Sequence, residues 1–215
     1  HWQLRVNWQK KLKKINKFIY LISPNTIKDV NFYRDLELVL KSTKVSHFQL
    51  RLKKEKPNKI IKIGKIIRKI CNKYRVKFLV NDNPLIAKKV NADGCHLGQS
   101  DIDIIKARKI LKNKIIGITC HNSKKLILRA IKNGADYIAL GSFFSTKTKN
   151  AKFKANIQIL KYAKTMTKIP IVVIGGIKSN NYKKLLLNKA NFLAISGYIW
   201  NNKKLKPIEA INKLK

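Results

Sequence analysis

The chain has 215 residues, of which 49 are Lys or Arg and 10 are Asp or Glu, so its formal net charge is +39. This length accommodates one large α/β domain or two small ones, and a hydrophobic content of 45% is typical of globular proteins. No apolar run reaches the about 18 residues of a transmembrane helix, and residues 1–17 lack the apolar stretch and cleavage site of a signal peptide.

The strongly basic composition has two interpretations. Lys and Arg clusters bind nucleic acids by releasing counterions from phosphates, but here the lysines are spread along the whole chain, without a basic motif that interleaves aromatic residues. In either case a basic surface attracts anionic ligands. We predict small phosphorylated substrates, with no specific nucleic-acid partner and no membrane partner, and a homo-oligomer is left open.

The cysteines are odd in number and far apart. Cys71, Cys95 and Cys120 form no CxxC pair, so neither a zinc knuckle nor a disulfide framework is indicated. A reducing environment suits such a chain, and the predicted location is therefore cytoplasmic.

Apolar, β-branched runs alternate along the chain with segments of helical periodicity. The predicted strands are residues 18–23, 47–52, 77–81, 94–97, 115–120, 137–140, 169–174 and 192–196. The predicted helices are residues 31–40, 59–72, 102–111, 124–132 and 182–187. Gly134 follows a helix end as a good C′ residue, and Pro170 is acceptable only near the start of its strand.

This alternation predicts a parallel sheet, and the strand count fits a single-domain (β/α)8 TIM barrel over residues 18–215. Residues 1–17 would form a basic N-terminal extension, as an extra helix or a tail. A doubly wound open sheet is the alternative fold, although no GxGxxG motif follows the first strand.

In a barrel the functional groups lie at the carboxyl ends of the strands. Most of these ends in this chain carry polar, acidic or glycine residues. In chain order they are Gln49, Arg51 and Lys53; Asn81 and Asp82; Gln99 and Asp101; Thr119 and His121; Thr146, Thr148 and Lys149; Gly175 and Gly176; Ser196 and Gly197.

The segment after the second strand alternates polar and apolar residues. Gln49, Arg51 and Lys53 would share one face of an extended segment, while Leu50 and Leu52 would face the surrounding helices. Two cations and an amide on one face would make a diphosphate clamp. The alternative is an ordinary exposed strand face with solvated charges.

Two of the few acidic residues stand at consecutive strand ends. Asp82 and Asp101, with a diphosphate between them, would suit Mg²⁺, a hard cation that keeps several waters. The structural alternatives are equally simple. Asp101 could cap the following helix, with Asp103 in its first turn, and Asp82 could serve a turn before Pro84.

Three later segments suit phosphate groups. The loop after the sixth strand contains Thr146, Thr148 and Lys149, which supply hydroxyl donors and a positive charge. The pair Gly175-Gly176 allows close backbone approach to an anion. Ser196-Gly197 would form a second wall after the eighth strand. Each segment alone is also compatible with an ordinary solvated loop or tight turn.

The histidines near this face, His96 and His121, fit buried structural roles. No Ser-His-Asp or Cys-His arrangement is legible, although Cys120 adjoins His121. Covalent catalysis is therefore not predicted.

Taken together, these segments resemble the thiamine phosphate synthase family from about residue 18 to residue 200. They are FQLRLK at 48–53, VND at 80–82, GCHLGQSD at 94–101, GITCH at 117–121, STKTK at 145–149 and IGGI at 174–177. Their order and spacing make the resemblance specific.

The resemblance implies an Mg²⁺-dependent transferase that joins 4-amino-5-hydroxymethyl-2-methylpyrimidine diphosphate to 4-methyl-5-(2-phosphoethyl)thiazole or its carboxylated form. Thiamine phosphate and pyrophosphate are the products. The implied reaction is dissociative, because pyrophosphate leaves before the thiazole nitrogen attacks, and it needs no general base.

Site residues carry over by position. Arg51, Lys53 and Lys149 would stabilise the leaving group, and Asp82 and Asp101 would bind Mg²⁺. The pyrimidine diphosphate contacts would be Gln49, Arg51, Lys53, Asn81, Thr119 and Lys149. The thiazole phosphate contacts would be Thr146, Thr148, Gly176, Ser196 and Gly197.

The chain departs from the family pattern at several positions. Leu52 stands where Glu is usual, Ser145 where Pro is usual, and Thr119 replaces a common Ser. Ser196-Gly197 replaces Ile/Val-Ser, which displaces the hydroxyl by one residue. A related thiazole tautomerase with a catalytic histidine, a basic nucleic-acid-binding protein and a barrel that has lost activity are the alternative functions.

Overall fold

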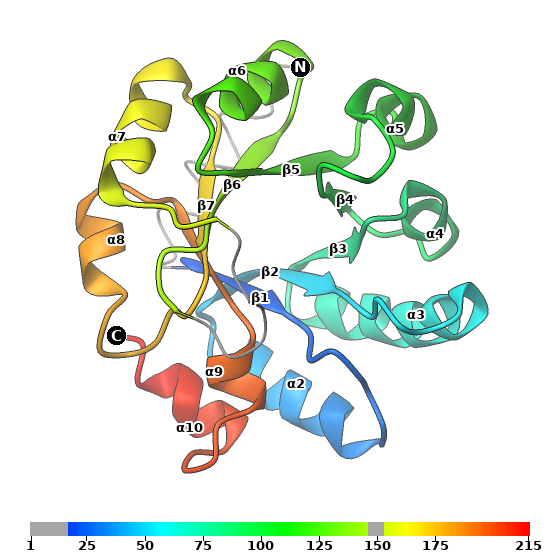
Figure 1. Cartoon of the computed structure of the whole chain (residues 1–215). Helices are drawn as coiled ribbons and strands as arrows, with labels where there is room; N and C mark the ends of the chain where they lie inside the picture. Colours follow the sequence, from blue (N-terminus) through cyan, green and yellow to red (C-terminus); the bar gives the residue numbers. More distant parts are fainter. Residues whose placement is uncertain (1–16, 146–152) are drawn as a thin grey trace.

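The computed structural model describes residues 17–145 and 153–215. Eight parallel strands close into a barrel in chain order, and β1 pairs with β8 to complete it (Figure 1). The predicted barrel is confirmed, and the open sheet is excluded. The strands are β1 (Ile19–Ile22), β2 (Val45–Leu50), β3 (Lys77–Asn81), β4 (Gly94–Leu97), β5 (Ile115–His121), β6 (Tyr137–Gly141), β7 (Ile171–Ile174) and β8 (Phe192–Ile195).

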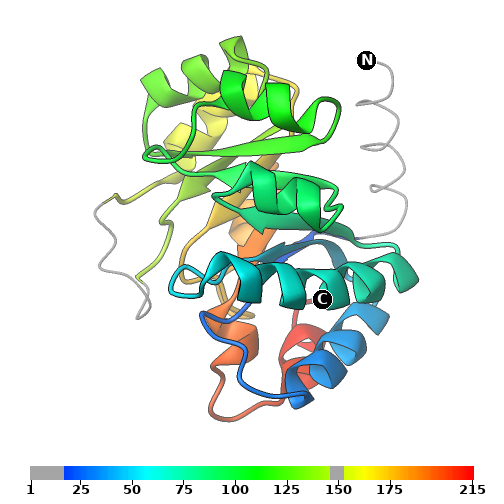
Figure 2. The same ribbon diagram turned by 90° about the vertical axis from the view of Figure 1, so that its right-hand side faces the viewer.

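Helices surround the strands, and in the second view α3 runs across the near side of the barrel (Figure 2). They are α2 (Asn31–Lys41), α3 (Pro57–Lys73), α4 (Pro84–Lys89), α5 (Ile104–Leu111), α6 (Lys124–Lys132), α7 (Ile157–Met166), α8 (Lys183–Leu187), α9 (Gly197–Trp200) and α10 (Pro207–Asn212). Within the described ranges, no helix combines the length and the apolar character needed to cross a bilayer.

The strands are largely buried, which is why most of them appear in the sequence as apolar runs. β2 is an exception, since it also buries Ser46, His47 and Gln49. In β6, Ile138 and Leu140 face the helices, whereas Tyr137 and Ala139 belong to the smaller cluster inside the barrel. This alternation is the period of two expected of a strand. The interior is therefore filled by side chains, and the strand ends are left to build a site.

Most predicted elements differ from the structure by one or two residues at an end, and two of these differences have identifiable reasons. β2 ends at Leu50 because the next amide, that of Arg51, donates to the Ser23 hydroxyl at 2.9 Å instead of to a neighbouring strand. α5 begins at Ile104 because the Asp103 carboxylate caps it by accepting from the Ile105 amide at 2.8 Å.

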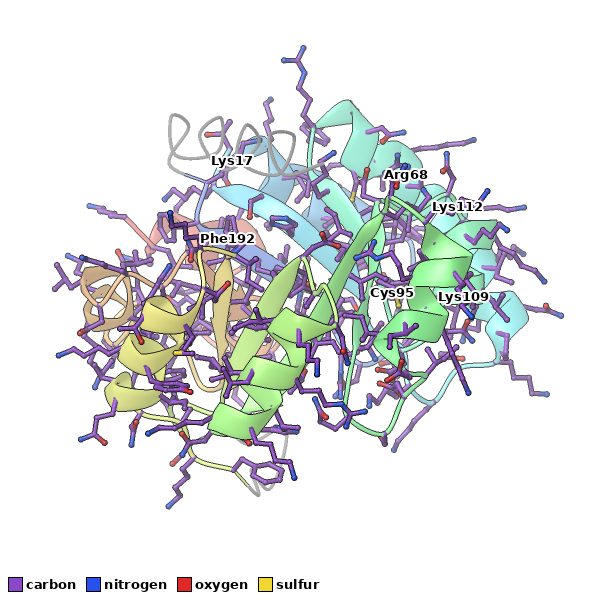
Figure 3. The ribbon with its side chains drawn as sticks, turned by 90° about the horizontal axis from the view of Figure 1, so that it is seen from above. Lys17, Arg68, Cys95, Lys109, Lys112 and Phe192 are labelled. Atoms are coloured by element: carbon purple, nitrogen blue, oxygen red, sulfur yellow. The ribbon has the colours of Figure 1, made fainter. Side chains whose placement is uncertain are left out.

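The helices α4, α7, α9 and α10 were missed by the sequence periodicity. α4 and α7 start at Asn caps, since Asn83 accepts from the Leu85 and Ile86 amides and Asn156 from the Ile159 amide. Gly134 adopts φ +79° after α6, as predicted, whereas Pro170 lies immediately before β7 and not inside the strand. Seen from above, nitrogen-tipped side chains project around the whole outline of the molecule (Figure 3). This distribution agrees with lysine spread over the surface.

Candidate active site

The ends of β1, β2 and β8 are joined through Ser23, a buried residue directly after β1. Its amide donates to the Gln49 carbonyl at 2.9 Å, and its hydroxyl accepts from the Arg51 amide at 2.9 Å. Its carbonyl accepts from the Ser196 hydroxyl at 3.0 Å. The sequence predicted Ser23 as the last residue of the first strand but did not single it out as a site residue. It sets the relative positions of three predicted site residues.

The two cations after β2 lie beside an acid. Lys53 Nζ is 3.3 Å from an Asp82 carboxylate oxygen, and an Arg51 guanidinium nitrogen lies 3.4 Å from Asn25 Oδ1. Burial lowers the pKa of Arg51, and the charge of Asp82 opposes that shift. The extended clamp predicted for Gln49, Arg51 and Lys53 is only partly right, since Gln49 is buried inside the barrel whereas the two cations follow the strand.

The predicted metal ligands are neighbours, in the segments that follow β3 and β4, and these two strands adjoin each other in the barrel (Figure 1). Asp82 adopts φ +65° directly after β3, and its amide donates to the His96 carbonyl at 2.7 Å. Burial and a hydrogen bond with the neighbouring Asp101 carboxyl raise the pKa of Asp82, while Lys53 acts in the opposite direction. The two carboxyl groups therefore meet in one place.

The helix-cap alternative for Asp101 is wrong. Asp103 caps α5, while an Asp101 carboxylate oxygen accepts from the Gly98 amide at 2.6 Å in the preceding loop. Asp101 therefore does not cap the helix, and its carboxyl group hydrogen-bonds to that of Asp82.

Two carboxylates of this kind fit Mg²⁺. In the described residues there is no group of three or more His, Cys, Asp or Glu side chains that could hold a metal ion alone. Mg²⁺ commonly uses one or two carboxylates and completes its shell with substrate phosphates and waters. The raised pKa of Asp82 also reflects an unfavourable pair of acids that a cation would stabilise.

A chain of hydrogen bonds crosses the barrel interior. Gln49 Nε2 donates to the Tyr20 hydroxyl at 2.8 Å, and the Tyr20 and Tyr137 hydroxyls are 2.7 Å apart. Tyr137 contacts His96 Nδ1 at 2.7 Å, and His96 Nε2 contacts the Thr119 hydroxyl at 2.8 Å. The predicted substrate residues Gln49 and Thr119 are thus connected. The two tyrosines were missed, although a polar aromatic residue at an inward strand position is a usable signal.

The remaining pyrimidine-side residue is Asn81. It ends β3, pairs in register with His96 of β4 and is partly exposed beside Asp82. The Thr119 carbonyl accepts from Gln99 Nε2 at 2.6 Å, which ties the loop before Asp101 to β5.

The glycine pair after β7 lies against the loop after β6. Gly175 and Gly176 have φ of +108° and +61°, and the Phe144 amide donates to the Gly175 carbonyl at 3.1 Å. A β-carbon on Gly176 would collide with the Ser145 carbonyl, and one on Gly175 with Ser142. Close approach of the two loops therefore requires glycine at both positions.

Thr146, Thr148 and Lys149 lie outside the described residues. The flanks of their segment are joined, because the Ser142 amide donates to the Phe153 carbonyl at 3.0 Å and the Ala155 amide to the Ser142 carbonyl at 2.8 Å. Ser145, the residue before that segment, lies close to Gly176, as does Phe144.

Ser196 and Gly197 are placed at the end of β8, as predicted. The Ser196 hydroxyl donates to the Ser23 carbonyl, so its hydrogen points to the seam, which is the junction where β8 pairs with β1 and closes the barrel. Gly197 begins α9 and presents its backbone to the same end of the barrel. His121 has φ +52° and its ring stacks on Phe153 with centroids 4.2 Å apart, which suits a packing role.

A closed (β/α)8 barrel with cations, paired carboxylates and glycine-lined loops at its strand ends defines a barrel enzyme built for phosphorylated small molecules. The thiamine monophosphate synthase family model matches residues 19–199, and the chain belongs to this family. The predicted family and transferase class are confirmed.

Relatives extend over nearly the whole chain. A thiamine-phosphate synthase of Pelagibacter ubique is 70% identical over 207 residues, covering 95% of this chain and 100% of the relative. One from Rhodospirillum centenum is 36% identical over 185 residues, covering 86% and 89%. The solved thiamine phosphate pyrophosphorylase of Pyrococcus furiosus superposes with a TM-score of 0.82 at 28% identity, covering 94% of this chain and 95% of its own.

Proposed function

We propose that this chain joins a pyrimidine diphosphate to a thiazole phosphate, producing thiamine phosphate and pyrophosphate. The observation that carries the proposal is the convergence of Arg51, Lys53, Asp82 and Asp101 at neighbouring strand ends. Two cations and two acids in contact suit a diphosphate that binds together with a divalent cation.

The main chemical task is stabilisation of charge on the leaving pyrophosphate. Arg51 and Lys53 are positioned for this, and Lys149 is proposed as a third cation. Asp82 and Asp101 would hold Mg²⁺, which supplies further neutralisation of phosphate charge when it is bound. Because the burial that lowers the pKa of Arg51 also reduces its hydration, its interaction with a phosphate is strengthened.

The nucleophile needs only to be held in place. A thiazole nitrogen has no proton to lose, so no general base is required, in agreement with the packing role of His121. Gly176 and Gly197 are proposed to bind the thiazole phosphate through their backbone amides, together with Thr146 and Thr148. Ser196 contributes through its backbone in this proposal, since its hydroxyl bonds to Ser23.

The test of the function is an endpoint assay with both phosphorylated substrates, with and without Mg²⁺. We expect thiamine phosphate to form only when the metal and both substrates are present. Folded protein that gives no product would contradict the proposal. The cytoplasmic location and the lack of a specific nucleic-acid partner stay predictions.

Gly176→Ala is expected to raise KM for the thiazole phosphate by tenfold or more. The new β-carbon would push the loop at Ser145 away from the phosphate site, in addition to straining a positive φ. Gly134→Ala is the matched control, because Gly134 has φ +79° but its β-carbon would meet nothing within 4 Å. Steady-state kinetics of both variants would refute the site if their KM values changed equally.

A further inference from the structure

In the hydrogen-bond chain inside the barrel, the donor and the acceptor of each link can be assigned from the chemistry of the groups. We call this order the direction of the chain. Tyr20 is fully buried, and among the described residues its hydroxyl meets only Gln49 Nε2 and the Tyr137 oxygen. An amide nitrogen donates and cannot accept. Tyr20 therefore accepts from Gln49, and its own proton has one acceptor available, the oxygen of Tyr137.

The remaining links follow from that first step. Tyr137, having accepted from Tyr20, donates to His96 Nδ1 at 2.7 Å. A neutral imidazole whose Nδ1 accepts carries its proton on Nε2, so His96 donates to the Thr119 oxygen at 2.8 Å. The Thr119 hydroxyl hydrogen is then directed away from His96. The opposite order would leave the buried Tyr20 proton without an acceptor, which is costly.

The hydrogen-bond chain fits inside the barrel because the neighbouring strand β5 has a glycine, Gly117, beside Tyr137. Gly117 of β5 stands opposite Tyr137 of β6 in register, and a β-carbon on Gly117 would collide with the Tyr137 ring. Burial also raises the pKa of both tyrosines, so each hydroxyl keeps the proton that the chain requires. Gly117 of β5 therefore leaves the space that the Tyr137 ring of β6 occupies in the hydrogen-bond chain.

We propose that Tyr20, Tyr137 and His96 are positioning residues that present the Thr119 hydroxyl as a hydrogen-bond donor to the pyrimidine diphosphate. Thr119 is partly exposed near the carboxyl end of β5, where such a donor can reach a ligand. The identity of the acceptor rests on the proposed function, whereas the direction of the chain does not.

The direction can be observed without substrate. Nuclear magnetic resonance of ¹⁵N-histidine-labelled protein distinguishes a protonated ring nitrogen from a bare one, and loss of the signal in His96→Gln identifies the residue. In the neutral ring we expect a proton on Nε2 and none on Nδ1. A His96 ring protonated on Nδ1 in the wild-type protein would overturn the proposal.

The functional consequence is tested by a double-mutant cycle on kcat/KM for the pyrimidine diphosphate. Thr119→Val and Tyr137→Phe are each expected to lower it by roughly tenfold to a hundredfold, the range for loss of a hydrogen bond to a charged group. The double variant should be within about twofold of Thr119→Val, because Tyr137 acts through that hydroxyl. Thr119→Ser, which keeps the hydroxyl, should lose less of kcat/KM than Thr119→Val.

Tyr182→Phe is the matched control. Tyr182 is also fully buried, but its hydroxyl donates to the Lys215 carbonyl outside the barrel interior. This variant should leave kcat/KM unchanged and combine additively with Thr119→Val. Effects of Thr119→Val and Tyr137→Phe that multiply would contradict the positioning role. If the wild type forms no thiamine phosphate, the proposed function fails, while the ring-nitrogen spectrum still decides the direction.

Discussion

Replacing either Asp82 or Asp101 with Asn is expected to reduce turnover by about two to three orders of magnitude, on the scale of removing one main electrostatic group from an active site. Asn keeps the shape of the side chain but lacks the charge that holds Mg²⁺. The pair contains the acidic ligands proposed for the metal, so each loss should also weaken Mg²⁺ binding. Turnover against Mg²⁺ concentration, together with calorimetric Mg²⁺ titration, measures both effects.

Asp103→Asn provides a close control for this prediction. Asp103 lies two positions from Asp101, but its carboxylate caps α5. Because Asn caps helices about as well as Asp, this variant should keep both stability and turnover. Near-normal turnover in both Asp82→Asn and Asp101→Asn would remove the metal assignment, and an equal loss in Asp103→Asn would point to general disruption.

Arg51→Ala is expected to lower kcat/KM for the pyrimidine diphosphate by about 10³, equivalent to roughly 4 kcal/mol. The guanidinium is partly buried beside Asp82 and is the best placed of the described cations for a planar, two-point contact with a phosphate. Arg51→Lys should recover only part of the activity, because an ammonium group cannot make the same bidentate contact. Steady-state kinetics at low and physiological salt would show both effects.

The overall positive field must be separated from this local contact. Arg34→Ala removes the same charge from an exposed position on α2 and should change kcat/KM by less than about twofold. If Arg34→Ala and Arg51→Ala had similar, strongly salt-dependent effects, the high net charge and not the position of Arg51 would explain activity.

The barrel could be predicted because a buried strand appears in the sequence as a short apolar run. Most strands are largely buried and therefore appear as apolar runs, and the bounds of β3 and β4 were predicted without error. The short helices were harder. α4 has only 6 residues, and its start depends on the Asn83 cap followed by Pro84, which in sequence reads equally well as a turn.

The positions of Asp82 and Asp101 were predictable, because each residue follows a strand end closely in the sequence. The candidate site was not predictable where function depends on contacts between distant segments. Tyr20 and Tyr137 are separated by 117 positions and meet only because the barrel closes around them. The role of Ser196 changed for the same reason, since its hydroxyl bonds to Ser23 across the strand seam.

That seam has a consequence for how the protein acquires activity during translation. The bond between Ser196 and Ser23 spans 173 positions, and the Trp200 indole nitrogen donates to the Ile22 carbonyl at 2.7 Å across 178 positions. A nascent chain therefore exposes an open sheet edge until its last strand leaves the ribosome. Contacts at such separation form slowly, because the entropy of closing the loop must be overcome first. Catalytic competence is then a property of the finished polypeptide, and a prematurely terminated product would carry most of the residues proposed to bind substrates without a closed barrel to hold them.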